Sequence, residues 1–202
     1  MTGTTPDTPS PTIAMEGAIK RAKVHGSSLV GVYNTSHCGM AGYYADMARK
    51  EDLVALLFAD CLPRITTFGG SERILGTNPL AVSIPSNSTP ILFDMSTASI
   101  GFGLGLIIQI LAGVLVNAAT IPPPGVNDGL LMIAIDSSIF VPIDLFKREV
   151  DVLLDCLKAT RREAGVEEIA IPGERAYRER EQRLETGIDL EDNLLAQRDR
   201  CI

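Results

Sequence analysis

The chain has 202 residues, enough for one domain with a substantial core. Its 25 acidic residues outnumber its 18 basic ones, which gives a net charge of −7, and no basic patch dominates the sequence. This balance speaks against a protein that binds nucleic acid or an anionic membrane surface. The 18 glycines and 12 prolines predict many turns.

The first residues form a tail of low complexity. Residues 1–12 are rich in Thr, Pro and Ser and contain no basic stretch followed by an apolar one. We therefore expect neither a signal peptide nor an Arg-rich transit peptide here. The composition predicts a disordered tail.

Helical and strand patterns alternate along the rest of the chain. The apolar spacing predicts helices at residues 13–24, 43–50, 142–163 and 175–185, and strands at residues 28–33, 53–59, 80–84, 91–95 and 129–136. The turn-forming residues 85–90 predict that the strands on either side of them pair as a hairpin. This alternation of elements indicates an α/β fold.

A long uncharged stretch separates Asp94 from Asp128. Within it, residues 100–116 are almost wholly apolar and are long enough to count as a candidate membrane span. The alternative is a helix buried on all sides within the fold. Glycines, Gln109 and the lack of a flanking Lys or Arg cluster favour the buried helix.

The turn after the first strand carries the residues most suggestive of chemistry. Ser36 and His37 stand between that strand and the next helix, and Gly39 and Gly42 would let a ligand approach the backbone. Histidine has an unperturbed pKa of about 6.5, so it can accept or donate a proton near neutral pH. The turn is therefore a candidate site for acid–base chemistry.

The four cysteines are scattered and form no CxxC motif; they are Cys38, Cys61, Cys156 and Cys201. We expect free thiols in a reducing compartment, and no metal site. A nucleophilic pair of Cys38 with His37 is the alternative, although adjacent residues on a turn rarely face each other.

Six segments in this order together resemble the type-2 malate/L-lactate dehydrogenase family. They are residues 34–44 (NTSHCGMAGYY), 68–81 (FGGSERILGTNPLA), 93–97 (FDMST), 103–115 (GLGLIIQILAGVL), 132–136 (MIAID) and 171–174 (IPGE). This non-Rossmann group of NAD(P)-dependent oxidoreductases includes enzymes for ureidoglycolate, sulfolactate and Δ1-piperideine-2-carboxylate. The resemblance extends from about Pro11 to Leu190.

The resemblance implies a fold and a division of the chain. It implies the family's α/β fold, a mixed sheet flanked by helices, in an incomplete form. The apolar run resembles the family's internal helix. We expect a tail at residues 1–12, a partial NAD(P)-binding and catalytic domain at residues 13–171, and a charged helical segment at residues 172–202.

The resemblance also implies a reaction, namely hydride transfer between a small 2-hydroxy acid and NAD or NADP. In this reading His37 is the general acid and base, and Ser36 orients the imidazole or the substrate. The predicted cofactor contacts are Asp94, Met95, Ser96, Cys61, Leu130 and Leu131. The structural alternatives are a helix cap for Asp94, a plain turn at residues 77–79 and a satisfied buried histidine at His37. We expect a cytoplasmic homodimer, or a dimer with a full-length paralogue.

Two blocks typical of the family have no counterpart in this sequence. One is the family's amino-terminal segment, before Thr12, and the other lies between Ser99 and Gly101. Arg64 and Arg73 are the only basic residues on loops suited to hold a substrate carboxylate. We therefore expect a truncated member and a poor catalyst when alone, because an unoriented substrate loses the proximity contribution to rate. The alternatives are a non-catalytic subunit that dimerises through the apolar helix, and a membrane-anchored protein.

Overall fold

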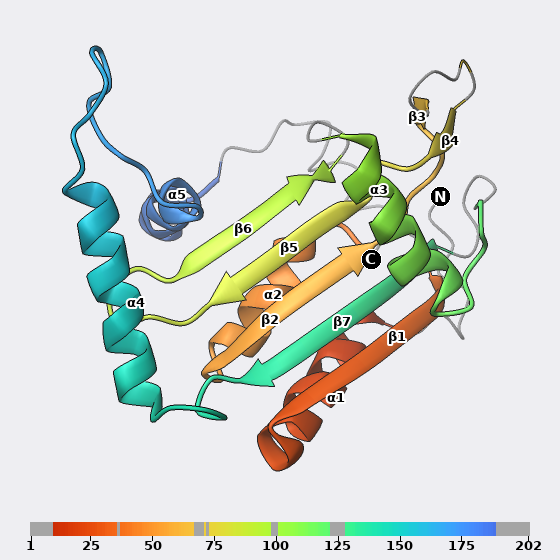
Figure 1. Cartoon of the computed structure of the whole chain (residues 1–202), viewed down its shortest axis with the longest axis horizontal. Helices are drawn as coiled ribbons and strands as arrows, with labels where there is room; N and C mark the ends of the chain where they lie inside the picture. Colours follow the sequence, from red (N-terminus) through yellow and green to blue (C-terminus); the bar gives the residue numbers. More distant parts are fainter. Residues whose placement is uncertain are drawn as a thin grey trace.

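A five-stranded sheet organises the fold, with the strands in the order β1-β7-β2-β5-β6 (Figure 1). The computed structural model describes residues 10–35, 37–66, 71, 73–97, 101–121 and 128–188. The strands of this sheet are β1 (Ser27–Thr35), β2 (Leu53–Ala59), β5 (Pro79–Ile84), β6 (Ile91–Ser96) and β7 (Asp128–Asp136). The expected hairpin is confirmed, since β5 pairs with β6 from Pro79–Ser96 to Ile84–Ile91.

The expected α/β class is confirmed, with one difference in the sheet. All four described pairings within it are antiparallel, whereas we expected a mixed sheet. Strands β1 and β2 run in the same direction with a helix between them, as in a βαβ unit, but β7 lies between the two and pairs with both. Because β7, a strand from later in the chain, lies between β1 and β2, these two strands run parallel to each other without pairing.

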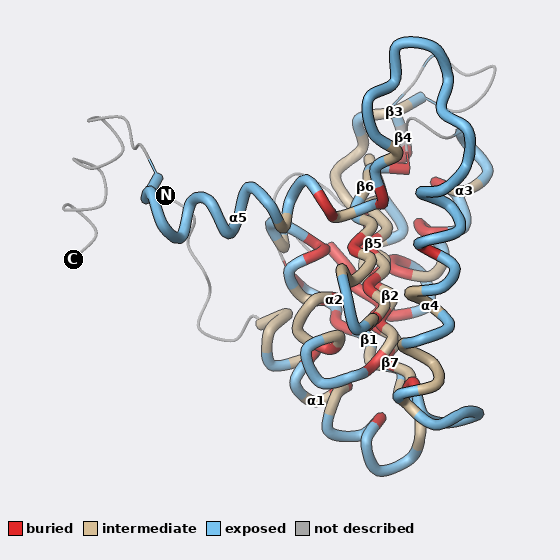
Figure 2. The backbone as a smooth tube through the Cα atoms, turned by 90° about the vertical axis from the view of Figure 1, so that its left-hand side faces the viewer, coloured by how far each residue is buried: buried red, intermediate tan, exposed pale blue. Residues whose placement is uncertain are grey.

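Two helices cover one face of the sheet. Helix α1 (Pro11–His25) and helix α2 (Ala41–Arg49) lie together behind the sheet in Figure 1 and to the left of the strands in Figure 2. They present small or flexible side chains to the strands, which are Met15, Ala18, Ala22, Ala41, Ala45 and Ala48. Small side chains bring the helix axes close to the sheet, so Leu57 and Met132 between them are fully buried. Helix α1 begins earlier than expected, at Pro11, because proline suits the first turn of a helix.

The apolar run forms a helix on the opposite face. Helix α3 (Phe102–Ile108) continues into a π-helical turn, η2 (Gln109–Val114), which packs on β7 and β2. Within the described residues, no helix is long and apolar enough to cross a membrane. The expectation that this helix is buried on all sides is wrong, because only one side touches the sheet. Ile107, Ile110 and Val114 are about half exposed on the other side.

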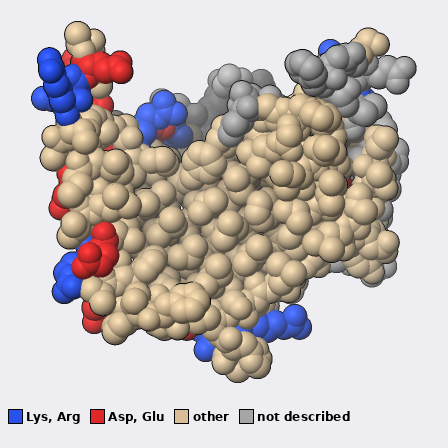
Figure 3. Space-filling view, viewed as in Figure 1, with Lys and Arg blue, Asp and Glu red and all other residues tan. Residues whose placement is uncertain are grey.

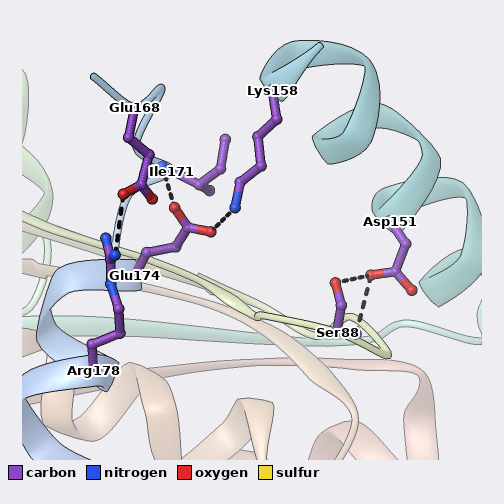
Figure 4. Close-up of polar contacts among 7 residues, drawn as sticks. All are labelled: Ser88, Asp151, Lys158, Glu168, Ile171, Glu174 and Arg178. Carbon is purple, nitrogen blue, oxygen red and sulfur yellow. Dashed lines mark hydrogen bonds and ion pairs between the residues drawn. The ribbon is translucent and has the colours of Figure 1, made fainter. Parts of the chain in front are cut away.

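The C-terminal part of the described chain adds two helices around the sheet. Helix α4 (Ile143–Lys158) begins after Pro142 as expected but ends five residues earlier, and α5 (Glu174–Thr186) carries the charged segment. Polar contacts hold them in place (Figure 4). The carboxylate of Asp151 accepts hydrogen bonds from the hydroxyl and the N–H of Ser88, in the turn of the β5–β6 hairpin. The buried Glu174 pairs with Lys158.

A short ribbon of β3 (Ile65–Thr66) and β4 (Arg73–Leu75) completes the described elements and projects at the upper right of Figure 1, beyond α3. It lies at the same end of the sheet as the start of β5, since β4 leads directly into the turn before Pro79. The ribbon therefore carries the two loop arginines, Arg64 and Arg73, toward this end of the sheet, and both are exposed.

Candidate active site

Five strand termini meet at one end of the sheet. Strands β1, β2 and β6 finish there, and β5 and β7 begin there, because Thr35 lies opposite Asp128 and Pro79 lies opposite Ser96. This antiparallel arrangement gathers polar residues that are far apart in the sequence. The candidate site lies at this end of the sheet.

His37 lies beyond the end of β1 and is exposed. Asp128 starts β7 directly opposite Thr35, and its side chain is buried. Burial raises the pKa of the Asp128 carboxyl, while the charge that the neighbouring His37 can carry lowers it. Within the described residues, the Oδ1 atom of Asp128 has no hydrogen-bond partner. The charges of His37 and Asp128 therefore influence each other at this end of the sheet.

Asp94 performs the structural role that we gave as its alternative. Its Oδ2 accepts a hydrogen bond of 2.7 Å from the backbone N–H of Gly42, in the first turn of α2. A carboxylate at a helix N-terminus satisfies a free N–H and is favoured by the helix dipole. A Cβ at Gly42 would lie 2.8 Å from this Oδ2, so the contact requires glycine there. The contact fixes the Ser-His turn, which leads into α2, against β6.

The neighbours of Asp94 lie at the same end of β6. Met95 is partly buried, and Ser96 is exposed and donates a hydrogen bond of 3.1 Å from its hydroxyl to the carbonyl oxygen of Thr77. The predicted turn at residues 77–79 is thereby tied to the end of β6. The roles of Asp94, Met95 and Ser96 toward a cofactor remain predictions.

Cys38, which follows His37 in the sequence, and Cys61, which lies near Cys38, are both partly buried. Burial, and to a smaller extent the nearby Cys61, raise the pKa of Cys38 to about 11. Burial also raises the pKa of Cys61. The three described cysteines are free. A thiol with a pKa of about 11 is protonated at neutral pH, which argues against the alternative of a Cys38 nucleophile.

A buried polar network lies directly beneath this end of the sheet. The side-chain amide of Asn78 donates hydrogen bonds of 2.9 Å to the carbonyl oxygen of Gly105 and to Oε1 of Gln109. Gln109 donates in turn to Asp60, over 3.4 Å, and Asp60 accepts a short hydrogen bond from the N–H of Gly129. The network therefore links the end of β2 and the start of β5 to α3, η2 and the start of β7.

Asp60 is the titratable group of this network. Burial raises its pKa to about 7, although the hydrogen bond from Gly129 favours the ionised form. Its hydrogen bond from the N–H of Gly129 fixes the backbone next to Asp128. The sequence reasoning missed Asp60, Gln109 and Asp128. The sequence held a signal for each of them: Asp60 follows an apolar strand, Asp128 precedes another, and Gln109 is a polar residue within the uncharged run.

The remaining predicted site residues lie apart from the exposed site or outside the described chain. Leu130 and Leu131 are in the middle of the sheet and only 1% and 4% exposed. Leu130 belongs to the core beneath α1 and α2, and Leu131 pairs with Gly31 and Phe58. Ser36 lies outside the described residues. Contacts of these three with a cofactor or substrate stay predictions.

Two cavities lie beside α5, and only the first borders the candidate site; the second lies near the β5–β6 turn, at the other end of the strands. One of about 490 Å³ lies between α2 and α5 and is lined by Met40, Gly42 and Tyr43 from the start of α2. The other, of about 470 Å³, lies between α5 and the end of α4, among paired charges such as Lys158 and Glu174. Neither is lined by His37. Within the described residues, no group of three or more His, Cys, Asp or Glu is arranged to hold a metal ion.

Comparisons with known proteins agree on one family. The family model described as malate/L-lactate dehydrogenase matches residues 9–100 and 100–197, which together span most of the chain. The malate/(S)-sulfolactate dehydrogenase of Methanothermus fervidus is 32% identical, over 90% of this chain and 68% of that protein. The ureidoglycolate dehydrogenase (NAD(+)) of Escherichia coli O157:H7 is 25% identical, over 90% of this chain and 68% of that protein.

The fold agrees with that of a solved structure. The malate dehydrogenase of Pyrococcus horikoshii OT3 superposes with a TM-score of 0.85 at 28% identity, covering 93% of this chain and 68% of that one. The chain thus spans about two thirds of the length of these relatives.

The same comparisons locate an internal gap. The family match is interrupted at residue 100, immediately before α3. The alignment with the M. fervidus protein spans 235 positions, of which this chain, with 90% of 202 residues, fills about 182. The relative therefore carries about 50 residues without a counterpart here. This agrees with the expected missing block between Ser99 and Gly101.

Proposed function

This chain belongs to the malate/L-lactate dehydrogenase family, and we propose that it transfers hydride between a small 2-hydroxy acid and NAD or NADP. The proposal is supported by the family match and by the position of His37, which is exposed just beyond the end of β1 and near enough for its charge to act on the buried Asp128, at the sheet end where Asp94 holds the start of α2. The family supplies the reaction class, and this pair supplies the proton chemistry. The preference for NAD or NADP is part of the proposal.

In the proposed reaction His37 removes the proton from the substrate hydroxyl. Asp128 stabilises the imidazolium that forms, and Asp60 positions Asp128 through the N–H of Gly129. Proton transfer by a positioned base typically contributes about 10²–10⁴-fold to a rate. A bound nicotinamide would accept the hydride at C4. In the reverse direction His37 returns the proton to the carbonyl oxygen.

The residues present offer a partial fit to such a cofactor. Met95 and Cys61 provide half-buried apolar and thiol surfaces, and a Cβ at Gly39 would meet open space, so a ligand can approach the backbone there. Arg64 and Arg73 are exposed on the ribbon and are the candidates to attract a carboxylate. We therefore propose weak cofactor binding and low turnover by this chain alone.

The test combines cofactor binding with a variant of the base. Titration with NADH and with NADPH, followed by fluorescence, measures binding and the preference between them. His37→Asn is expected to lower kcat by at least about 100-fold with malate, lactate or sulfolactate while leaving the Kd for the cofactor within about threefold. The matched control is His25→Asn, because His25 is exposed at the end of α1, and it should leave both values unchanged.

Two results would overturn the proposal. One is a lack of binding to both NADH and NADPH. The other is measurable turnover that His37→Asn and His25→Asn affect equally. In either case His37 would have no role as the base.

A second candidate function is favoured by the exposed side of α3 and η2. A non-catalytic subunit could use this apolar surface to bind a full-length member of the family. This candidate predicts aggregation of the chain alone and recovery in the supernatant on co-expression with such a partner. The small-molecule substrate, a dimeric state and a cytoplasmic location complete the primary proposal, and the free cysteines are consistent with a reducing compartment.

A further inference from the structure

The cavity of about 490 Å³ between α2 and α5 combines apolar walls with cationic side chains. From the sheet it is lined by Leu92 on β6, a side chain that is almost fully buried. The apolar residues that the two helices contribute are Met40, Tyr43, Ala176, Leu184 and Ile188. Sites for small molecules have volumes of about 300–1,000 Å³ and mostly apolar linings. The cavity therefore has the size and the lining to hold a ligand with an apolar body.

Two sets of contacts fix the walls of this cavity. At the start of α5, the N–H of Leu92 donates a hydrogen bond of 3.0 Å to the carbonyl oxygen of Pro172. Gly173 packs so closely there that a Cβ would lie 2.8 Å from the nitrogen of Leu92. Further along α5, the hydroxyl of Tyr177 donates a hydrogen bond of 2.8 Å to Oδ1 of Asp46 on α2. The two helices are thus held in position around a space that exists before any ligand binds.

Both carboxylates that line the cavity are already paired with cations. Asp46 pairs with Arg49 and Lys50 of its own helix. Glu179 on α5 pairs with Arg183, over 3.8 Å. Each negative charge at the wall therefore has a positive charge beside it, which reduces its repulsion of an anion.

Arg180 is the cation that remains. It lines the cavity and, within the described residues, makes no ion pair. The lining as a whole holds the cations Lys50, Arg180 and Arg183 against the carboxylates Asp46 and Glu179, in a chain with a net charge of −7. A guanidinium offers paired N–H donors that match the two oxygens of a carboxylate. A carboxylate at the edge of the cavity would therefore bind Arg180.

The opposite side of the sheet lacks this combination of apolar surface and charge. Figure 3 shows that side, where Lys, Arg, Asp and Glu appear only around the margin of the apolar surface. Helix α5 leaves the sheet on the other side, the side of α2 (Figure 2). An amphipathic anion can satisfy both its apolar body and its charge in the cavity, whereas the uncharged surface offers its charge no partner.

We propose that the cavity between α2 and α5 binds a small amphipathic carboxylate, with its apolar body against Leu92 and Leu184 and its carboxylate on Arg180. The cavity is separate from His37, but Gly42 lines it and donates its N–H to Asp94. A ligand bound there therefore lies beside the turn of α2 that the candidate site depends on. The proposal goes beyond the proposed hydride transfer and does not need it, because binding is measured without a nicotinamide cofactor.

The test is titration calorimetry of the full chain with decanoate and with 2-naphthoate, an alkyl and an aryl carboxylate. We expect either or both to bind, whereas acetate, which lacks the apolar body, and decyltrimethylammonium, which reverses the charge, should not. Arg180→Gln should raise the Kd about tenfold. The matched control is Arg21→Gln, which changes the net charge equally at an exposed position on α1 and should leave the Kd unchanged.

A second pair of variants tests the apolar wall. Leu184→Ser should raise the Kd about fivefold, because the ligand loses apolar contact area. Leu184 is 70% exposed, so the substitution should leave the fold intact. Its control is Leu153→Ser on α4, at a position that is 56% exposed and does not line the cavity, and the Kd should stay the same.

Methionine methyl groups locate the bound ligand in a ¹³C-methyl-labelled chain. Decanoate should shift the signal of Met40, which lines the cavity and is assigned with Met40→Leu. The signals of Met95, whose side chain points to the opposite face of β6 from Leu92, and of the fully buried Met132 should not move. Three results would overturn the proposal: no binding of either carboxylate, equal Kd values for Arg180→Gln and Arg21→Gln, or a shift of Met95 in place of Met40. Failure to bind NADH or NADPH would contradict the proposed function and leave this proposal standing.

Discussion

Ionisation of Asp60 should make the stability of this protein decrease as the pH rises from 5 to 8. The carboxyl is buried at the end of β2 and has a pKa of about 7 in the folded state, against about 3.9 in an unfolded chain. Between these values the folded state binds one more proton than the unfolded state. The free energy of unfolding therefore falls with increasing pH in this window and levels off above pH 8.

The magnitude follows from the difference in pKa. The measured range covers about two pKa units, from pH 5 to the folded-state pKa of about 7, which corresponds to a limit of about 3 kcal/mol. The surroundings relax around a buried charge as if the effective dielectric constant were about 20, so we expect about half of that limit, about 1.5 kcal/mol. Asp60→Asn removes the ionisation but keeps an oxygen that can accept the hydrogen bond from Gly129. The pH dependence should fall below about 0.5 kcal/mol in this variant.

Urea unfolding followed by circular dichroism at pH 5, 6, 7 and 8 measures both proteins. Burial also raises the pKa of Asp128, which adds to the slope of the wild type and of the variant alike. The carboxyls whose pKa is lowered, including Asp46 and Glu174, are ionised throughout this range and add no slope. The difference between the two proteins therefore isolates Asp60. Equal slopes in wild type and Asp60→Asn would refute the reasoning.

Two further predictions concern the positions that hold the site together. Gly129→Ala should lower the free energy of unfolding by about 3 kcal/mol or more, because its Cβ would collide with the carbonyl oxygen of Ala112 and separate η2 from β7. The control, Gly17→Ala, adds a Cβ in open space within α1 and should stabilise by about 0.5–1 kcal/mol in thermal melts. Asp94→Ala should cost about 1 kcal/mol by removing the contact to Gly42, and unchanged stability would show that the N–H finds another partner.

The sequence by itself determined the local elements of this protein. A continuous run of apolar residues located β2 at its observed bounds, and the run of turn-forming residues after Ile84 identified the hairpin. The Ser-His turn was recognised as the point where a strand passes into a helix. Each of these features depends on residues close together in the chain, and their periodicity is visible without knowledge of the fold.

Only the tertiary structure decided which strands are neighbours. Strand β7 lies between β1 and β2, far from both in the sequence, and this insertion places Asp128 opposite Thr35, the residue before the Ser-His pair, and brings the N–H of Gly129 to Asp60. Local patterns carry no record of such pairing, because register depends on contacts between distant segments. The exposure of the sheet is likewise a tertiary property. The same apolar strands that predict a buried sheet are left partly exposed on the face opposite α1 and α2, because within the described chain α3 and η2 cover only part of that face.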